Sequence, residues 1–367
     1  MHKSALYILF IALLIVSIGI ISIYSSTYQK EGKPWQDIYK RQILWIIIGA
    51  VFFVLLSNLH YRRLWDWTYP LYIVALFLLL LVFVSGVVRL GAQRWLKIAW
   101  FNFQPSEFAK LILAIFLARY FSRKSVDDVS VLSKRFGIFR GIILPFIFVS
   151  IPIFFIIEQP DLGSGMILLL LFVTFLYLTG VKMRYVIIFI FVMALPLPFI
   201  WHLLRDYQKQ RLLVFLDPNI DPLGAGYTVI QSKIAVGSGW LWGKGWLSGT
   251  QSQLHFLPES HTDFIFATFA EEWGFLGSAL LLLLYYLLIH RGFMIAKRTN
   301  DPFGKLLAFG ISLMFSIQVF INIAMNMGLA PVVGVPLPLM SYGGSSILVT
   351  FIALGILANI DKTRGVF

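Results

Sequence analysis

Hydrophobic residues in this chain occur in long runs that are separated by short polar and charged links. The ten runs cover residues 5–24, 43–57, 69–88, 106–121, 141–157, 163–180, 185–204, 263–289, 303–327 and 344–360. Most of them approach the roughly 20 residues that a helix needs to cross a bilayer. Because none alternates like a membrane strand, the pattern predicts an all-α, polytopic membrane protein with ten transmembrane helices.

One long polar stretch interrupts this pattern between the seventh and eighth runs. Residues 205–262 are rich in glycine and polar residues, and they also contain Tyr227, Trp240, Trp242 and Trp246. A loop of this length in a compact protein is usually either functional or disordered. The low charge density and the aromatic residues favour order. We therefore expect a folded cap over the membrane-facing end of a site.

Composition agrees with this class and narrows the ligands. The chain of 367 residues is 59% hydrophobic and 13% charged, and its mean hydropathy is +0.83. It has no cysteine, which excludes disulfides and thiolate chemistry. Its net charge of +13 is scattered between the apolar runs, so we expect anionic membrane lipids or a lipid diphosphate as ligands, and no nucleic acid. Neither a repeat nor a linker divides the chain, and residues 1–367 are predicted to form one domain.

The distribution of basic residues predicts the orientation. The links on the side of the N-terminus carry sixteen lysines and arginines, and the short links on the other side carry seven. Since cytoplasmic links are enriched in lysine and arginine, both termini are predicted to be cytoplasmic. The loop at 205–262 then lies outside the cytoplasmic membrane.

Two charged residues lie near the start of the fourth run, in the segment FNFQPSEFAK at 101–110. Pro105 is suited to a first helical turn, which places Glu107 and Lys110 on one helix face. An ionisable residue inside a membrane run costs a few kcal/mol and usually has a role. Either the pair neutralises itself and fixes helix packing, or Lys110 binds an anionic substrate while Glu107 positions it. The spacing leaves both interpretations open.

Two further segments place charged residues at helix starts. In EQPDLGSG, at 158–165, Asp161 is expected to cap a helix and the glycines to allow close packing. In LPESHTDFIFATFAEEWG, at 257–274, Thr262 is expected to be an N-cap and Asp263 to lie in the first turn, where the helix dipole favours its carboxylate. Glu271 and Glu272 lie deeper and require a partner such as Arg94, Lys110 or water.

Basic residues also border the loop. Arg205, Lys209 and Arg211 follow the seventh run, and Arg94 lies beside Trp95 in GAQRWLK. They either bind a diphosphate or extend to the lipid head groups, which is the commoner use of basic residues at helix ends. No spacing of histidines or aspartates predicts a zinc site, and we expect no metal site made by the protein alone. A metal taking part would be a hard cation shared between a carboxylate and substrate phosphates.

The motifs together resemble those of the SEDS (shape, elongation, division and sporulation) family, and the resemblance covers nearly the whole chain in order. They are QRW at 93–95, FQPSEFAK at 103–110, QPDLGSG at 159–165, DPLGAGY at 221–227, QSKIAVGSG at 231–239, LPESHTDFIF at 257–266 and PLPLMSYGGSS at 336–346. The segment GKGWLSGTQSQLHFLPE at 243–259 and the short tails resemble the elongation branch of the family more than its division branch.

This resemblance implies a ten-span peptidoglycan glycosyltransferase of cell elongation and rod-shape maintenance. Such an enzyme polymerises lipid II, an undecaprenyl-diphosphate disaccharide-pentapeptide, at the outer face of the cytoplasmic membrane and releases undecaprenyl diphosphate. The family's essential aspartate matches Asp263, its membrane lysine and neighbouring glutamate match Lys110 and Glu107, and Arg94 and Asp161 match other polar positions of the cavity. The usual partner in the family is a class B penicillin-binding protein, which crosslinks the new glycan.

A mechanism follows as a hypothesis. Transfer between two lipid-linked sugars needs a base for the acceptor hydroxyl and positive charge for the diphosphate leaving group. Asp263 would take the proton, and Lys110, Arg94 and Arg211, with a divalent cation (Mg²⁺ or Mn²⁺), would hold the diphosphate. The alternatives are a lipid II flippase, an ion-coupled transporter that uses the membrane carboxylates, a non-catalytic scaffold, and the division paralogue.

Overall fold

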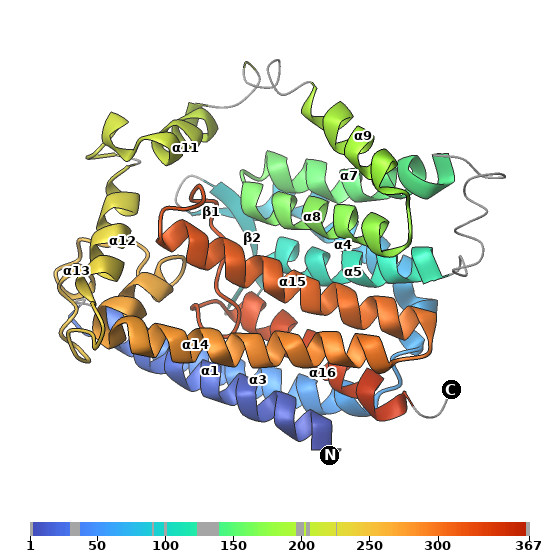
Figure 1. Ribbon diagram of the computed structural model, residues 1–367, viewed down its shortest axis with the longest axis horizontal. Coiled ribbons are helices and arrows are strands. Elements are labelled where there is room, and N and C mark those ends of the chain that lie inside the picture. Colours follow the sequence, from blue (N-terminus) through green and yellow to red (C-terminus); the bar gives the residue numbers. More distant parts are fainter. Residues whose placement is uncertain are drawn as a thin grey trace.

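The computed structural model describes residues 3–29, 37–89, 92–98, 101–122, 139–195, 202, 206–224 and 226–364. Its fold is dominated by helices that run side by side (Figure 1). The long helices are α1 (Lys3–Thr27), α3 (Ile38–Asn58), α4 (Arg63–Ser85), α5 (Pro105–Ser122), α7 (Leu144–Glu158) with the π-helical turn η1 (Phe139–Ile143), α8 (Leu162–Leu178), α9 (Met183–Ala194), α14 (Ile265–Arg298), α15 (Pro302–Asn326) and α16 (Gly344–Thr363).

Seven of the described helices are long and apolar enough to cross a membrane: α1, α3, α4, α7 with η1, α14, α15 and α16. Two shorter apolar helices, α8 and α9, add to the same bundle. The chain is thus a multi-pass membrane protein. The second half of the run at 185–204 lies largely outside the described residues, as does Arg205.

The polar residues of α5 are explained by its position in the bundle. This helix begins at Pro105 as the sequence indicates, and it carries Glu107, Lys110 and Arg119 within 18 residues. It packs against α4, α8, α15 and α16, and almost all of its residues are buried. The protein interior, and not lipid, therefore surrounds its charges.

The prediction that the run at 69–88 stays helical to its end is wrong. Helix α4 ends at Ser85, and the chain continues as a three-stranded antiparallel sheet of β1 (Gly86–Arg89), β2 (Ala92–Ile98) and β3 (Phe101–Phe103). Gln93 fastens the start of the sheet, because its side-chain amide donates to the carbonyls of Val82 and Gly86 at 2.9 and 3.0 Å. The sheet carries Arg94 and leads directly into α5.

The two ends of the bundle differ. The helices of the long loop gather at one end, called the loop end, while α1 starts and α16 finishes at the other, called the terminal end (Figure 1). At the terminal end, Arg291 of α14 donates to Ser4 of α1 and to Asp361 of α16. At the loop end, Ser25 of α1 donates to Glu272 of α14. Both termini therefore lie on the side away from the loop.

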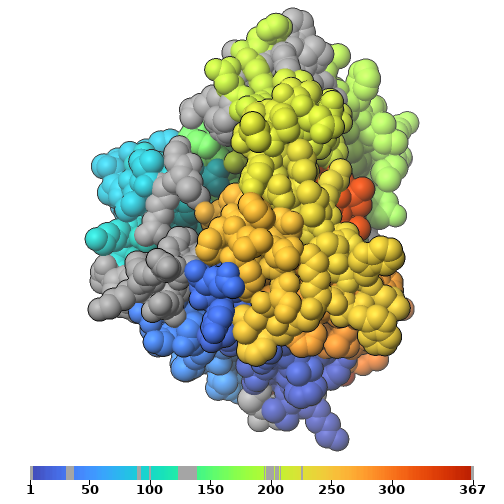
Figure 2. Space-filling model, turned by 90° about the vertical axis from the view of Figure 1, so that its left-hand side faces the viewer, coloured from blue at the N-terminus to red at the C-terminus, as the bar shows by residue number. Residues whose placement is uncertain are grey.

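The long loop is folded, in agreement with the expectation of a cap. It contains α11 (Asp206–Leu216), the 3₁₀ turn η2 (Pro218–Ile220), α12 (Tyr227–Ser238) and the short α13 (Thr250–Gln253). Helix α12 packs on α14 and α15, and α13 contacts α1. Figure 2 shows the loop end, which residues of this loop and of the start of α14 largely cover.

Helix α14 is interrupted at Gly274, and the loop completes its hydrogen bonding. Gly274 has φ 62° and ψ −160°, a conformation available almost only to glycine. The amides of Phe275 and Leu276 donate to the carbonyls of Trp240 and Leu241 at 2.8 and 3.2 Å. In return, the carbonyls of the two preceding glutamates accept from the amides of residues 244 and 245. The loop is thereby fixed to the helix by its main chain.

Candidate functional site

Asp263 lies at the loop end, where the long loop joins α14. The prediction that it occupies the first helical turn under a Thr262 cap is wrong, since α14 begins at Ile265 after the non-capping Phe264. The Thr262 hydroxyl instead donates to the Glu259 carboxylate at 3.1 Å. Asp263 is therefore held in a loop, outside the helix whose dipole was expected to stabilise its charge.

Two buried asparagines of α15 hold the main chain of Asp263. The side-chain amides of Asn322 and Asn326 both donate to its carbonyl oxygen at 3.0 Å. Asn322 also donates to the carbonyl of Val335 at 2.7 Å, and Asn326 accepts from the amide of Ala267 at 3.1 Å. Both asparagines are fully buried. Four hydrogen bonds thus join Asp263, the start of α14 and the segment after α15.

The segment before α16 holds the other side of the same turn. The Ser341 hydroxyl donates to the carbonyl of Thr262 at 2.7 Å, and the amide of Tyr342 donates to the carbonyl of His261 at 2.9 Å. Residues 261–263 are consequently bonded to two elements that are distant in sequence. The main chain that carries the Asp263 carboxylate is thus fixed, which suits a group that must be in position before it reacts.

The Asp263 carboxyl group lies among charges of both signs. A β-carbon added to Gly334 would lie 3.5 Å from Asp263 Oδ2 and 3.6 Å from Arg94 Nη1, so both groups border the backbone at Gly334. Burial, as the larger cause, and the neighbouring Glu259 raise the pKa of Asp263 to about 6, against the opposing effect of Arg94 and Arg211. Desolvation outweighs both cations, so the carboxyl group can exchange a proton near neutral pH.

Arg94 and Asp161 are both held at the turn of residues 159–161. Arg94 donates through Nε to the carbonyl of Gln159 at 3.1 Å and through Nη2 to that of Pro160. Asp161 is the N-cap of α8, as the sequence predicts, because Oδ1 accepts from the Ser164 amide at 3.1 Å. Its Oδ2 accepts from the Ser106 hydroxyl at 2.9 Å, which joins α8 to the start of α5. Asp161 thus stabilises the turn that positions Arg94.

Glu107 and Lys110 form an ion pair inside the bundle. Lys110 Nζ lies 2.7 Å from Glu107 Oε1, and the two side chains are 1% and 3% exposed. The two residues therefore contact each other, which is compatible with both interpretations that the spacing left open. Removing one partner would leave an uncompensated buried charge, which is strongly destabilising.

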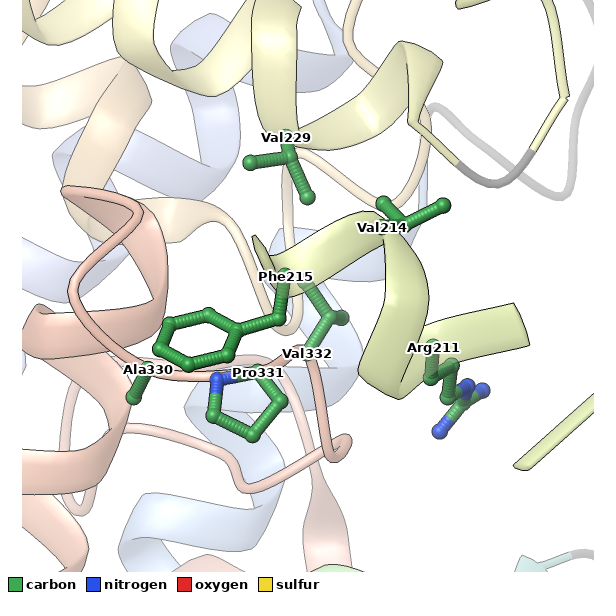
Figure 3. Close-up of a pocket in the computed structure, with 7 residues that line it drawn as sticks. All are labelled: Arg211, Val214, Phe215, Val229, Ala330, Pro331 and Val332. Carbon is green, nitrogen blue, oxygen red and sulfur yellow. The ribbon is translucent and has the colours of Figure 1, made fainter. Parts of the chain in front are cut away.

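Arg211 belongs to α11 in the loop and contributes to a small pocket. The pocket lies between α11, α12 and the segment that follows α15, and its other lining residues are apolar (Figure 3). Phe215 of α11 and Pro331 also line it. Arg211 is near enough to Asp263 to lower its pKa. Lys209 lies on the same helix, and no described contact joins it to Asp263.

Residues of the loop and of α1, and not Arg94 or Lys110, are the side-chain partners of the two glutamates of α14. Glu271, which is fully buried, pairs with Lys244 of the loop at 2.7 Å and also accepts from the Thr250 hydroxyl at 3.0 Å. Glu272 accepts from Ser25 of α1. These carboxylates anchor the loop to α1 and α14, and neither contacts Arg94 or Lys110.

Sequence reasoning missed the asparagine pair and Lys244. Asn322 and Asn326 are four residues apart on an otherwise apolar run, and buried polar side chains at such positions usually have a bonding role. That spacing was a usable signal. Lys244 gave none, because its partner is 27 residues away and on another element.

Within the described part of the chain, no group of three or more histidine, aspartate or glutamate side chains could hold a metal ion. Asp161 already accepts two or more hydrogen bonds, and Glu259 accepts one from Thr262. Few oxygen atoms near Asp263 remain available as metal ligands. They fit a hard cation that takes most of its oxygen ligands from another molecule.

Comparison with known proteins connects this geometry to a family. The family model described as a cell cycle protein, covering FtsW, RodA and SpoVE, matches residues 5–365. This is a SEDS protein. The chain is 44% identical over 358 residues to the peptidoglycan glycosyltransferase MrdB of Escherichia coli K12, covering 97% of this chain and 92% of the relative. It is 36% identical to a probable peptidoglycan glycosyltransferase FtsW of Geobacter sulfurreducens, covering 98% and 95%.

Solved structures agree with the SEDS assignment. A chain from a peptidoglycan synthase complex that coordinates polymerisation and crosslinking has a TM-score of 0.80 and 31% identity, with 97% of each chain covered. The rod shape determining protein RodA of Thermus thermophilus has a TM-score of 0.70 and 28% identity, covering 97% of this chain and 96% of that one. The SEDS fold and the resemblance to RodA-type members are thereby confirmed.

Proposed function

We propose that this chain is the elongation-type peptidoglycan glycosyltransferase of its cell, and that it polymerises lipid II at its loop end. The observation that carries the proposal is the arrangement around Asp263: a carboxyl group on a fixed main chain, with a pKa of about 6, near Arg94 and Arg211, in a SEDS chain. The higher identity to MrdB than to the FtsW relatives supports the elongation branch over the division branch.

The membrane arrangement is part of the same proposal. The ten apolar runs make ten spans in a single domain of residues 1–367, and the loop at 205–262 lies between the seventh and eighth. Both termini lie in the cytoplasm and the loop lies outside the cytoplasmic membrane. The excess of basic residues on the links that share the side of the N-terminus supports this orientation. It puts Asp263 on the face where lipid II is polymerised.

Asp263 is the general base of the proposed reaction. It accepts the proton of the acceptor 4-hydroxyl as that oxygen attacks the anomeric carbon of the donor and the bond to the diphosphate breaks. A base works best when its pKa is near the working pH, and a carboxyl group with a pKa of about 6 meets this condition better than an exposed aspartate.

Cationic side chains stabilise the diphosphate leaving group. Arg94 and Arg211 are the candidates for direct contact, because both influence the charge of Asp263 from fixed elements. Asp161 acts on the substrate through the turn that holds Arg94. Lys110 and Glu107 act as a pair. The Lys110 ammonium group stabilises the negative charge of the diphosphate, and Glu107 positions that ammonium group. Loss of either group is expected to affect folding as well as activity.

A divalent cation, Mg²⁺ or Mn²⁺, completes the proposed site. It would lie between a carboxylate of this site and the substrate phosphates, and it would supply positive charge to the leaving group. If so, chelation with EDTA abolishes polymerisation, and either ion restores it. Full activity in EDTA would contradict the cation.

The proposed partner is a class B penicillin-binding protein, and the proposed lipid ligands are lipid II and undecaprenyl diphosphate. The structural neighbour from a complex that couples polymerisation to crosslinking supports such a partner. The membrane-facing surface requires lipid contacts in addition.

Reconstitution in liposomes tests the proposal against transport. The chain and its partner are supplied with fluorescent lipid II, and glycan strands are separated by gel while movement of the lipid between leaflets is followed by quenching. We expect glycan strands to form, and we expect their formation not to require movement of lipid II between the leaflets. Movement of lipid II with no strands would contradict the proposal and favour the flippase.

A further inference from the structure

A groove at the terminal end, far from Asp263, is not explained by the proposed function. It has a volume of about 340 Å³ and separates the start of α1 from the last turns of α14. The side chains that matter for its chemistry are Lys3 and Tyr7 of α1 and Leu287, His290, Arg291 and Met294 of α14.

The groove is positively charged. Lys3 and Arg291 line it, and among the residues that the structure describes no acidic side chain does. Asp361 lies behind it, 3.0 Å from Arg291, but this carboxylate is shared with Arg364 at 3.1 Å. Arg291 Nη2 also donates to Ser4, whereas its Nε is buried with no hydrogen-bond partner among the described residues.

Apolar surface continues from the groove along both helices. Leu6 and Phe10 of α1 are 52% and 62% exposed, and Leu283 and Tyr286 of α14 are 50% and 59% exposed. These residues belong to helices that are long and apolar enough to span the membrane. The groove therefore combines a cationic end with an apolar extension toward the bilayer centre.

We propose that this groove binds one anionic phospholipid, whose head-group phosphate contacts Lys3 and Arg291 and whose acyl chains lie along α1 and α14. A free phosphate or a soluble anion would use only the cationic end, and the exposed apolar residues would have no occupant. Basic pockets between transmembrane helices are suited to anionic head groups in this way.

A partner's transmembrane helix fits this groove less well. In the orientation proposed above, the terminal end is cytoplasmic, and the cytoplasmic ends of membrane helices are enriched in lysine and arginine. Such a helix would bring more positive charge against Lys3 and Arg291. An anionic lipid neutralises these charges instead.

Native mass spectrometry of the delipidated full-length chain tests the proposal without depending on enzymatic activity. The probes are dioleoyl phosphatidylglycerol and dioleoyl phosphatidylcholine, which share their acyl chains and differ in charge. We expect the wild type to retain the anionic lipid at least fivefold better. Lys3→Gln, which removes an exposed charge, lowers that retention about fivefold, and Arg291→Gln lowers it at least as much.

Lys297→Gln is the matched control, because Lys297 is an exposed lysine of the same helix that does not line the groove. It is expected to retain the lipid as the wild type does. Equal retention of the two lipids by the wild type, or an equal loss in Lys297→Gln and Lys3→Gln, would overturn the proposal. Displacement of the lipid by millimolar glycerol 3-phosphate would also overturn it. If Arg291→Gln does not fold, Lys3→Gln decides the test.

Discussion

At the scale of single residues, the site depends on how burial changes one carboxyl group. Asp263 would titrate near pH 4 in an unfolded chain, and in the folded chain its pKa is raised to about 6 by desolvation and by Glu259. The proton is therefore bound more tightly in the folded state. Between pH 4 and pH 6 the folded chain carries a neutral Asp263 that would be ionised in the unfolded chain.

This shift predicts the pH dependence of catalysis. A base must be deprotonated to accept a proton, so the polymerisation rate at lipid II concentrations well below KM, which reports the free enzyme, should decrease about tenfold per pH unit below pH 6. The measurement is the initial rate between pH 4.5 and pH 8, with folding verified at each pH by thermal unfolding. A rate that stays level down to pH 4.5 would show that another group is the base.

A second prediction at this scale concerns the support of Asp263. Asn322→Ala leaves the Val335 carbonyl without its side-chain donor and removes one of two donors to Asp263, which should lower the free energy of unfolding by about 1–3 kcal/mol. It should also reduce kcat at unchanged KM, because the carboxylate is less well positioned. Unfolding and kinetics are compared with Asn300→Ala, at an exposed position between helices. Equal behaviour of the two variants would exclude a positioning role.

At the scale of elements, the helices were predictable and the connections were not. The start of α5 at Pro105 and the cap of α8 at Asp161 follow from local preferences, which act within one turn. The strand at Gly86–Arg89 was missed because its valines prolong an apolar run, while its pairing with β2 is a tertiary interaction. Asp263 was misplaced for the same reason, since Asn322, Asn326 and Ser341 hold its turn from distant segments.

The interruption of α14 provides a prediction at this scale. Gly274→Ala puts a β-carbon 2.3 Å from the amide nitrogen of Gly243 in a conformation that alanine avoids, and it should destabilise the chain by roughly 3 kcal/mol or more. Gly237→Ala is the control, because its added carbon in α12 has no atom within 4 Å apart from the neighbouring residues and backbone of its own helix. The thermal unfolding temperatures should differ clearly. If Gly274→Ala is as stable as Gly237→Ala, the loop does not require this break.

At the scale of the whole molecule, the fold brings distant motifs to one end of the bundle. Arg94 follows α4, Arg211 lies in the loop and Asp263 precedes α14, yet all three influence the same titration. The resemblance to the SEDS motifs implies that Arg94 and Asp263 are site residues, but only the fold shows that both border Gly334. The pairing of Lys244 with Glu271 likewise depends on how the loop returns to α14.

The most direct test of the central claim is glycan polymerisation by Asp263→Asn, purified with its class B partner while a β-lactam blocks crosslinking. Asp66→Asn, at an exposed position of α4, is the matched control. We expect glycan product to decrease about 10²–10⁴-fold in Asp263→Asn and to stay at the wild-type level in Asp66→Asn, with both variants folded and bound to the partner. Undiminished product from folded Asp263→Asn would contradict the assignment of Asp263 as the base.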